Sequence, residues 1–368
     1  MSPNPERAKE LQALTTLELG GKAEYYIAAR SLEEILQALS FARDRKLPVC
    51  LLGGGSNTIF SDQGFSGLVL HLQTKGVELI DEDERSALLD VQAGEVWDDF
   101  VSHCIAHGLA GVECLSGIPG YVGAVPIQNV GAYGQEVSRT IESVRCLDRI
   151  TFEQVVFTNS QCDFAYRQSR FKSYDKNRYV VLSVAFRLWR KTIEEPRYEE
   201  LKQAMADLPG AQAASRSARP EERIEALLRL RQAVLALRKK KSMVVDPHDP
   251  ESKSAGSFFM NPVIPQSGIE DFRRKMTEAG FEEYPCFPAE SGQAYKLSAA
   301  WLVEKSGFAK GYSENGVGIS ASHSLALVNR GGSTKALMEL SRKIQKRVLD
   351  FSGVWLEREP VLVGPEEA

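Results

Sequence analysis

Residues 116–136 constrain the fold of this chain more than any other stretch. They read SGIPGYVGAVPIQNVGAYGQE and contain five glycines and two prolines. Glycine weakens regular elements and proline removes a backbone donor, so the segment is poorly suited to a helix or a central strand. We expect an extended ribbon against a flat ligand, with the amides of Gln128 and Asn129 as donors and acceptors. A long structural loop is the alternative.

A second glycine-rich stretch, LLGGGSNTIF at residues 51–60, follows a strand predicted over residues 49–52. Thr58 stands where a dinucleotide-binding fingerprint has its third glycine, and no Gly-Lys-Ser/Thr follows, so neither that fingerprint nor a P-loop is present. Successive backbone N–H groups beside Ser56 and Asn57 can form an anion-binding nest. A tight turn that needs a glycine with positive φ is the other interpretation.

Composition narrows the class of protein. The 368 residues are 43% hydrophobic and 26% charged, with a formal net charge of -4, as in soluble globular proteins rather than general binders of nucleic acid or membrane surfaces. The first residues, MSPNPERAKELQALTTLELGG, lack the apolar core that a signal peptide needs, and the sequence has no apolar run of about 18 residues, so we expect no membrane-spanning segment. The six cysteines are scattered without a CxxC pair, which favours reduced thiols in a cytoplasmic protein.

Periodicity and turn residues predict the main elements. Residues 31–48 begin with a Ser31–Glu34 capping box and continue as a helix, and a helix over residues 96–105 ends before Gly108. Residues 141–190 have a β pattern, residues 205–218 indicate a mobile connection, and residues 333–349 an amphipathic helix. A long helix begins at Pro220 and ends in a basic run at 238–241; its inner side is predicted to carry Ile224, Leu227, Leu228 and Leu235.

Three polar side chains stand in unusual surroundings. Arg167 lies in AYRQSRFK at residues 165–172, and by itself is typical of a structural ion pair. AGSFFMNP at residues 255–262 contains Ser257 and Asn261, and because no GxSxG motif surrounds Ser257, a turn-capping serine is the simpler interpretation. His103 and His107 have helical i, i+4 spacing without an HExxH pattern, so we predict no metal site.

Six segments in the same order resemble the UDP-N-acetylenolpyruvoylglucosamine reductase family of bacterial peptidoglycan synthesis, over nearly the whole chain. Besides the four already quoted, they are KLSAAWLVEKSG and LEREPVLVG. The resemblance implies an α+β fold, with a two-part FAD-binding unit of the vanillyl-alcohol-oxidase (PCMH) type and a C-terminal α+β domain that binds a UDP-sugar. The expected domains are residues 1–70 joined by the tail 356–368, residues 71–235, and residues 236–355.

The resemblance also implies the cofactors. NADPH would supply hydride through FAD, and because neither glycine-rich segment contains the histidine by which related flavin oxidases attach their cofactor, we expect non-covalent FAD. The glycine loop would hold the pyrophosphate and the second segment the remainder of FAD. The matching residues are Gly53, Gly54, Gly55, Ser56, Asn57, Thr58, Ser116, Gly117, Ile118, Pro119, Gly120, Gly123, Gln128, Asn129, Gly131, Ala132 and Tyr133.

Three residues match the family's catalytic positions. The family reduces the enolpyruvyl ether of a UDP-sugar to a lactyl ether; Arg167 would stabilise the carboxylate, Ser257 would donate the proton, and Glu359 would assist. The family commonly reads Leu-x-Pro-Glu-Val near its C-terminus, whereas this chain reads Leu-Glu-Arg-Glu-Pro at residues 356–360. Alignment on Leu356 and Gly364 selects Glu359, with Glu357 as the alternative.

Substrate contacts follow from the same resemblance. Tyr198 matches the mobile-loop tyrosine of one subclass, type I, and a cationic pair at the end of the long helix would meet the UDP pyrophosphate. A solvated helix end is the other interpretation of these basic residues. The expected contacts are Tyr166, Tyr198, Arg238, Lys241, Asn261 and Lys296. We expect a monomer that binds the UDP-linked enolpyruvyl sugar and NADPH, without nucleic acid and without membrane insertion.

Two other functions fit parts of the pattern. A flavin oxidase acting on an alcohol or sugar would explain the FAD segments but leaves Ser257 and the basic residues 238–241 without a role. A regulator that binds a nucleotide sugar without turnover would explain the fold but not the presence of Arg167, Ser257 and a glutamate together.

Overall fold

The computed structural model describes residues 4–190, 198–208, 219–289 and 292–365. The chain divides into two compact units. The first unit comprises Met1–Lys9, Glu24–Gly54 and Ser66–Lys240, and the second comprises Glu10–Ala23, Gly55–Phe65 and Lys241–Ala368. The glycine loop therefore contributes Gly53 and Gly54 to the first unit and its following residues to the second. The three-part division expected from the family resemblance stays a prediction.

One sheet of the first unit carries the strand that leads into the glycine loop. Its order is β1 (Glu6–Glu10), β2 (Lys22–Ala29), β5 (Phe65–Leu72) and β3 (Val49–Leu52), and β3 pairs with β5 in parallel. Helix α1 (Leu32–Asp44) buries Ile35, Ala38, Leu39 and Ala42 in the core beside this sheet. The predicted helix and strand are confirmed, and a parallel strand that ends at Leu52 leaves the following glycines at the sheet's edge.

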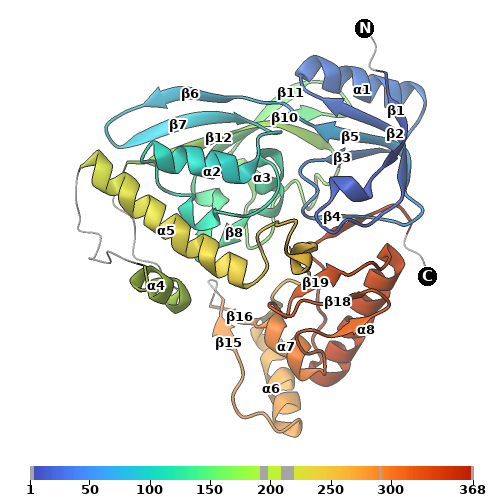
Figure 1. Cartoon of the computed structure of the whole chain (residues 1–368), viewed down its shortest axis with the longest axis vertical. Coiled ribbons are helices and arrows are strands. Elements are labelled where there is room, and N and C mark those ends of the chain that lie inside the picture. Colours follow the sequence, from blue (N-terminus) through green and yellow to red (C-terminus); the bar gives the residue numbers. More distant parts are fainter. Residues whose placement is uncertain (1–3, 191–197, 209–218, 290–291, 366–368) are drawn as a thin grey trace. The chain divides into compact units, whose positions relative to one another are not determined.

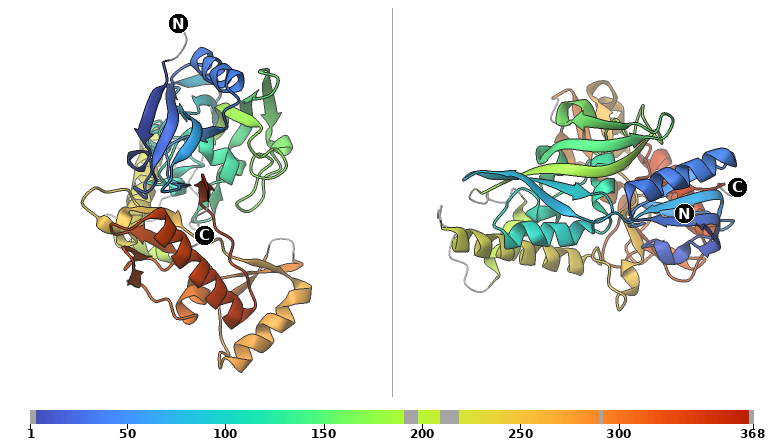
Figure 2. Two further views of the ribbon diagram at one scale, coloured as in Figure 1. Left: turned by 90° about the vertical axis from the view of Figure 1, so that its right-hand side faces the viewer. Right: turned by 90° about the horizontal axis from the view of Figure 1, so that it is seen from above.

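A five-stranded antiparallel sheet forms the larger part of the first unit. Its order is β11 (Gln154–Thr158), β10 (Ile141–Asp148), β12 (Tyr179–Trp189), β7 (Ser86–Gln92) and β6 (Val77–Glu82). Helix α2 (Trp97–Ala106) lies between this sheet and the long helix α5 (Pro220–Lys240), as Figures 1 and 2 show. The fully buried Trp97 packs there against Phe100 and Phe186.

The glycine- and proline-rich segment is less extended than the sequence predicts. It contains a short helix α3 (Val125–Gln128), followed by the two-residue strands β8 (Gly131–Ala132) and β9 (Gln135–Glu136). Pro126 is compatible with α3 because the first helical turn leaves its N–H groups without an intrahelical partner. Ahead of the helix the segment is fixed by backbone bonds from Trp97 to Gly120 O at 3.0 Å and from Val122 to Glu95 O at 2.9 Å.

The predicted inner side of α5 is confirmed for Leu227, with Ile224 and Leu235 half-buried, and is wrong for Leu228. The buried residues of α5 are Leu227, Leu230, Ala233, Val234 and Leu237, whereas Leu228 is 44% exposed. Helices α2 and α4 (Glu199–Ala206) both contact α5, and Leu201 of α4 packs in one cluster with Leu230, Val234 and Leu237, so burial falls on these positions rather than on Leu228. The expected mobile connection at 205–218 was also wrong in part, since residues 205 and 206 are helical; residues 209–218 lie outside the described residues.

The second unit holds two small antiparallel sheets and a parallel strand pair. The order of the first sheet is β13 (Ser254–Ser257), β19 (Ala326–Asn329), β18 (Val317–Ile319) and β17 (Ser313–Glu314). The order of the second sheet is β14 (Val263–Pro265), β16 (Ala294–Leu297) and β15 (Cys286–Pro288). Strand β20 (Val361–Val363) pairs in parallel with β4 (Thr58–Phe60). The helices are α6 (Ile269–Glu278), α7 (Ala299–Lys305) and α8 (Thr334–Ser352) (Figure 1). None of the helices in the described ranges is long and apolar enough to cross a membrane.

Candidate active site

The glycine loop combines a close backbone approach with a tight turn. A Cβ on Gly54 would lie 2.7 Å from Gly120 Cα, so the loop touches the second glycine-rich segment where both lack side chains. A Cβ on Gly53 would lie 3.8 Å from Tyr121 Cβ, an ordinary van der Waals contact. Gly55 has φ +67°, and a Cβ there would collide with the carbonyl of Leu14. The tight-turn interpretation is therefore confirmed at Gly55, and the anion-binding nest stays a prediction.

The stacked rings of Tyr121 and His71 lie beside this loop. The sequence did not predict this pair. Their rings stack with centroids 5.8 Å apart and an interplanar angle of 11°, and His71 Nδ1 is 2.8 Å from Tyr26 Oη. Burial lowers the pKa of His71 from 6.5 to about 4, and the backbone of Gly53 acts weakly in the opposite direction. The aromatic residue inside a glycine-rich stretch was the one available signal, and nothing in the sequence linked it to His71.

Several predicted cofactor residues use their side chains to hold the segment itself. Ser116 Oγ donates to Glu113 O at 2.6 Å, and Gln128 Oε1 accepts from Lys172 Nζ at 3.0 Å. Asn129, with φ +41°, donates from Nδ2 to Glu136 and to Ala165 O, and accepts the N–H of Ser138. The side chains of Ser116, Gln128 and Asn129 are therefore engaged in hydrogen bonds within the protein.

Arg167 is held against the same segment. Its Nη2 donates to Gly131 O at 2.7 Å and its Nη1 to Asn129 O at 3.4 Å. The guanidinium carbon lies 5.4 Å from the centre of the Tyr166 ring, and the residue has a left-handed backbone with φ +53°. The first unit thus brings Arg167 and Tyr166 to residues 129–131, and their roles toward a substrate stay predictions.

Two more predicted residues of the first unit meet through an aromatic contact. Tyr133 and Tyr198 pack edge to face with centroids 6.1 Å apart, and Tyr198, immediately before α4, is 53% exposed. Burial lowers the pKa of Arg238 near the end of α5, and Tyr133 and Asp98 act in the opposite direction. Arg238 is half-buried, whereas Lys239 and Lys240 at the end of the same helix are exposed.

The second unit brings Asn57, Ser257 and Glu359 to one place. The tail pairs with the residues after β13 through the antiparallel bridge Phe259–Arg358. Glu359 N donates to Phe258 O at 2.9 Å, and Asn57 Nδ2 donates to Glu359 O at 3.2 Å. Within the described ranges no group hydrogen-bonds to Ser257 Oγ, which is half-buried at the end of β13.

The remaining predicted contacts of the second unit lie on the next sheet. Asn261 Oδ1 accepts the N–H of Ala299 at 2.9 Å, and Lys296 lies opposite Val263 in the pairing of β14 with β16. Thr58 begins β4, in register with Val361 of β20. Lys241 is the first residue of this part of the unit.

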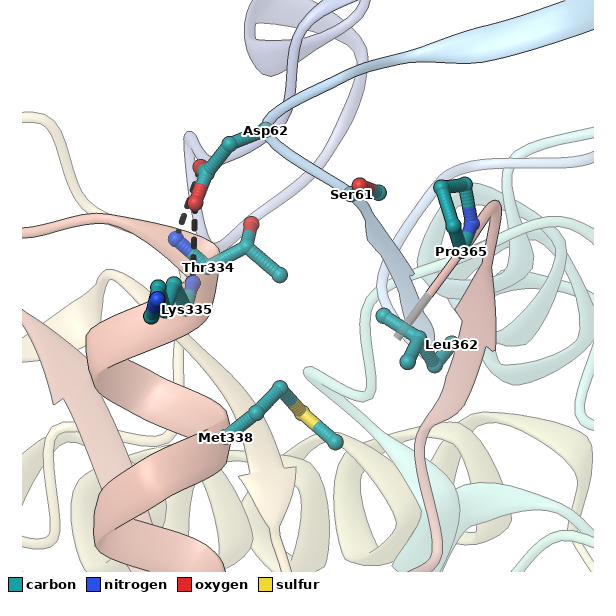
Figure 3. Close-up of a pocket in the computed structure, with 7 residues that line it drawn as sticks. All are labelled: Ser61, Asp62, Thr334, Lys335, Met338, Leu362 and Pro365. Carbon is teal, nitrogen blue, oxygen red and sulfur yellow. Dashed lines mark hydrogen bonds between the residues drawn. The ribbon is translucent and has the colours of Figure 1, made fainter. Parts of the chain in front are cut away.

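A shallow pocket beside β20 is not an anion site, although a helix begins there. Figure 3 shows the carboxylate of Asp62 turned toward the first turn of α8, where Oδ1 accepts the N–H of Thr334 and Oδ2 that of Lys335, both at 2.8 Å. A carboxylate already satisfies these N–H groups and the helix dipole. No group of three or more His, Cys, Asp or Glu residues among those described is placed to bind a metal ion.

Comparisons with known proteins assign these parts of the chain. Residues 23–150 match the family model described as FAD binding domain, and residues 248–363 match that of the UDP-N-acetylenolpyruvoylglucosamine reductase C-terminal domain. The reductase of that name from Thermobifida fusca is 41% identical, over 99% of this chain and 99% of its own. The one from Streptomyces avermitilis is 44% identical, over 97% and 94%.

A solved structure confirms the fold. The crystal structure of the reductase of this name from Thermus caldophilus superposes with a TM-score of 0.63 at 24% identity, over 98% of this chain and all of that chain. The α+β class, with an FAD-binding part followed by the reductase's C-terminal domain, is therefore confirmed.

Proposed function

Because this chain belongs to the UDP-N-acetylenolpyruvoylglucosamine reductase family, we propose that it reduces UDP-N-acetylglucosamine enolpyruvate to UDP-N-acetylmuramate with NADPH. It is an FAD-dependent oxidoreductase of peptidoglycan synthesis. The observation that most supports the mechanism is the pairing that brings Glu359 to the strand of Ser257. We also propose a cytoplasmic location, since all six cysteines are free thiols.

The glycine-rich segments fit FAD. The backbone of residues 53–54 contacts residues 120–121, with Gly54 and Gly120 at the closest approach. The side chains of Ser116 and Asn129 form hydrogen bonds within the protein. Exposed backbone N–H groups of such a loop suit a pyrophosphate. We propose that these segments hold FAD without a covalent bond. The chemistry that FAD supplies when bound is hydride transfer, from NADPH to the methylene carbon of the enolpyruvyl group.

Arg167 is proposed to bind the carboxylate of the enolpyruvyl group. Negative charge develops on this carboxylate as the methylene carbon is reduced, and a fixed cation stabilises it. The two carbonyls of residues 129 and 131 already orient the guanidinium, so its position is set before substrate arrives. A planar fork also suits a carboxylate better than an ammonium group does.

Ser257 is proposed to deliver the proton that completes the reduction. Its hydroxyl has no hydrogen-bond partner within the described residues, so it is available to a substrate. Gly256 has φ +72°, which fixes the backbone just before the serine in a turn that favours glycine. Glu359 is proposed to assist through its carboxylate beside the same strand, and proton transfer from a positioned group is the kind of step such a pair accelerates.

The substrate's nucleotide part is proposed to meet cationic, amide and aromatic side chains. Arg238 and Lys241 would bind the pyrophosphate, Asn261 and Lys296 would donate to the same group, and Tyr166 and Tyr198 would pack against the sugar nucleotide. Arg238 is half-buried at the end of α5, whereas the two lysines that follow it are exposed, which supports a ligand contact over a solvated helix end.

NADPH and the sugar are proposed to take turns at the flavin, which requires a ping-pong mechanism. Initial rates measured over a grid of both concentrations test this. We expect parallel lines in double-reciprocal plots and competitive inhibition of flavin reduction by excess sugar. Intersecting lines, with no effect of the sugar on flavin reduction, would show that both substrates bind at once.

A further inference from the structure

Asp98, on the first turn of α2, joins two predicted ligand-binding segments of the first unit. Its Oδ1 accepts the backbone N–H of Gly117 at 2.6 Å and Arg231 Nη1 at 2.6 Å, while Oδ2 accepts Arg231 Nη2 at 2.7 Å. The side chains of Arg231 and Asp98 are only 16% and 30% exposed. A bidentate pair with so little exposure is among the stronger and more directional polar contacts in proteins.

At one end of this connection the glycine-rich segment touches α5. Gly117 has φ +72°, and a Cβ there would lie 2.7 Å from Leu235 Cδ2 and 3.4 Å from Arg238 Nε. The carboxylate therefore holds the N–H of a residue that lies directly on the helix carrying Arg238. A shift of α5 along its axis would change the contact of its Leu235 and Arg238 side chains with the backbone of Gly117.

At the other end, the ion pair fixes the rotation of α5. Arg231 and Arg238 are seven residues apart, close to two helical turns, so they lie on one face of the helix. The bidentate contact of Arg231 with the Asp98 carboxylate fixes the rotation of α5 about its axis. The direction in which the Arg238 side chain leaves the helix is therefore fixed as well. Arg231 and the N–H of Gly117 also keep the pKa of Asp98 below its ordinary value, although burial alone would raise it.

We propose that Asp98 is a positioning residue that couples the flavin-binding segment to Arg238, the proposed pyrophosphate contact on α5. The inference rests on the proposed function, which assigns FAD to residues 116–133 and the sugar nucleotide to Arg238. The two partners of Asp98 have separable effects. Loss of the carboxylate releases both Gly117 and α5, whereas loss of Arg231 releases only α5.

The test compares Asp98→Ala, Arg231→Gln and Arg231→Lys in the full chain. We measure the Kd of FAD by flavin fluorescence, and KM and kcat for the UDP-linked enolpyruvyl sugar. Asp98→Ala is expected to raise both the FAD Kd and the sugar KM by about tenfold, with kcat within about threefold. Arg231→Gln is expected to raise KM by about fivefold and leave the FAD Kd within about twofold, with Arg231→Lys between it and the wild type.

Arg145→Gln is the matched control. It removes another arginine–aspartate pair of the same unit, which has a single contact from Arg145 Nη2 to Asp90 Oδ2 at 2.7 Å between β10 and β7. We expect a comparable loss of melting temperature with the FAD Kd and KM unchanged. The inference is overturned if Asp98→Ala binds FAD and sugar like the wild type, or if Arg145→Gln shifts both equally. A wild-type flavin that the sugar does not reoxidise would instead contradict the proposed function, and the FAD Kd would still test the Asp98–Gly117 contact.

Discussion

Glu359 donates its backbone N–H to the carbonyl oxygen of Phe258 at 2.9 Å, which places it beside the strand that ends at Ser257. The same antiparallel pairing sets Glu357 against Met260 instead, whose N–H donates to Glu357 O at 2.9 Å. Glu357 is exposed and Glu359 is half-buried. Two glutamates only two residues apart thus differ in exposure, and the backbone of Glu359 pairs nearer along the strand to the proposed proton donor.

Glu359→Gln should slow reoxidation of the reduced flavin by the sugar by about a hundredfold, because the assisting carboxylate is lost. Glu357→Gln makes the same chemical change at the exposed position and should leave the rate within about twofold. Stopped-flow absorbance of both variants gives the comparison. The reverse ranking would identify Glu357 as the functional residue.

Ser257→Ala should leave reduction of the flavin by NADPH intact and slow its reoxidation by the sugar by about a hundredfold or more, since only the second step needs the proton. Ser313→Ala, on the exposed strand β17, is the control and should behave as the wild type. Both half-reactions are followed separately under anaerobic conditions. Normal reoxidation in Ser257→Ala would mean that another group is the acid.

Arg167→Lys should lower the rate of sugar reduction by about a hundredfold or more, because an ammonium group cannot replace a fork held by two backbone carbonyls. Arg187→Lys, which alters an ion pair with Glu142 on the sheet, should have little effect. Single-turnover rates at saturating sugar separate this loss from weaker binding. An unchanged rate of sugar reduction in Arg167→Lys would mean that Arg167 has only a structural role.

His71 should make the fold less stable in acid. Its pKa is about 4 in the folded chain against an ordinary 6.5, so between these values the unfolded chain binds more protons. The unfolding free energy should therefore fall as pH drops from 6.5 to about 4, by at most about 1.4 kcal/mol per pH unit.

Urea unfolding at several pH values checks this. His71→Phe, which keeps a ring against Tyr121, should show a shallower decline than the wild type, and the exposed His248→Phe should not. Parallel stability curves for His71→Phe and the wild type would show that His71 is not responsible.

Local signals in the sequence were sufficient for the elements that depend on them. The Ser31 hydroxyl accepts the N–H of Glu34 at 3.1 Å at the start of α1, which is one half of the predicted capping box, while the Glu34 carboxylate accepts the N–H of Arg30 instead of that of Ser31. The apolar run at 49–52 is β3. Both features are decided within a few residues, where backbone bonding and side-chain type are directly related.

Contacts between distant parts of the chain left no comparable signal. The Asp98–Arg231 pair joins residues 133 positions apart, and the stack of His71 on Tyr121 depends on how a strand meets a loop. The exposed Leu228 was misassigned for the same reason, because the buried face of α5 is set by the two helices that contact it. The family resemblance supplied the candidate residues, and the structure supplied their neighbours.

An anaerobic visible spectrum of the purified protein tests the central claim most directly. One equivalent of NADPH is added first, and the UDP-linked enolpyruvyl sugar second. We expect a flavin absorption band at about 450 nm that bleaches with NADPH and returns with the sugar. This is the result that bound FAD gives when it takes hydride from NADPH and passes it to the sugar. A band that returns only with air would contradict the reductase function and favour an oxidase. A colourless protein that FAD does not reconstitute would contradict the assignment of both glycine-rich segments.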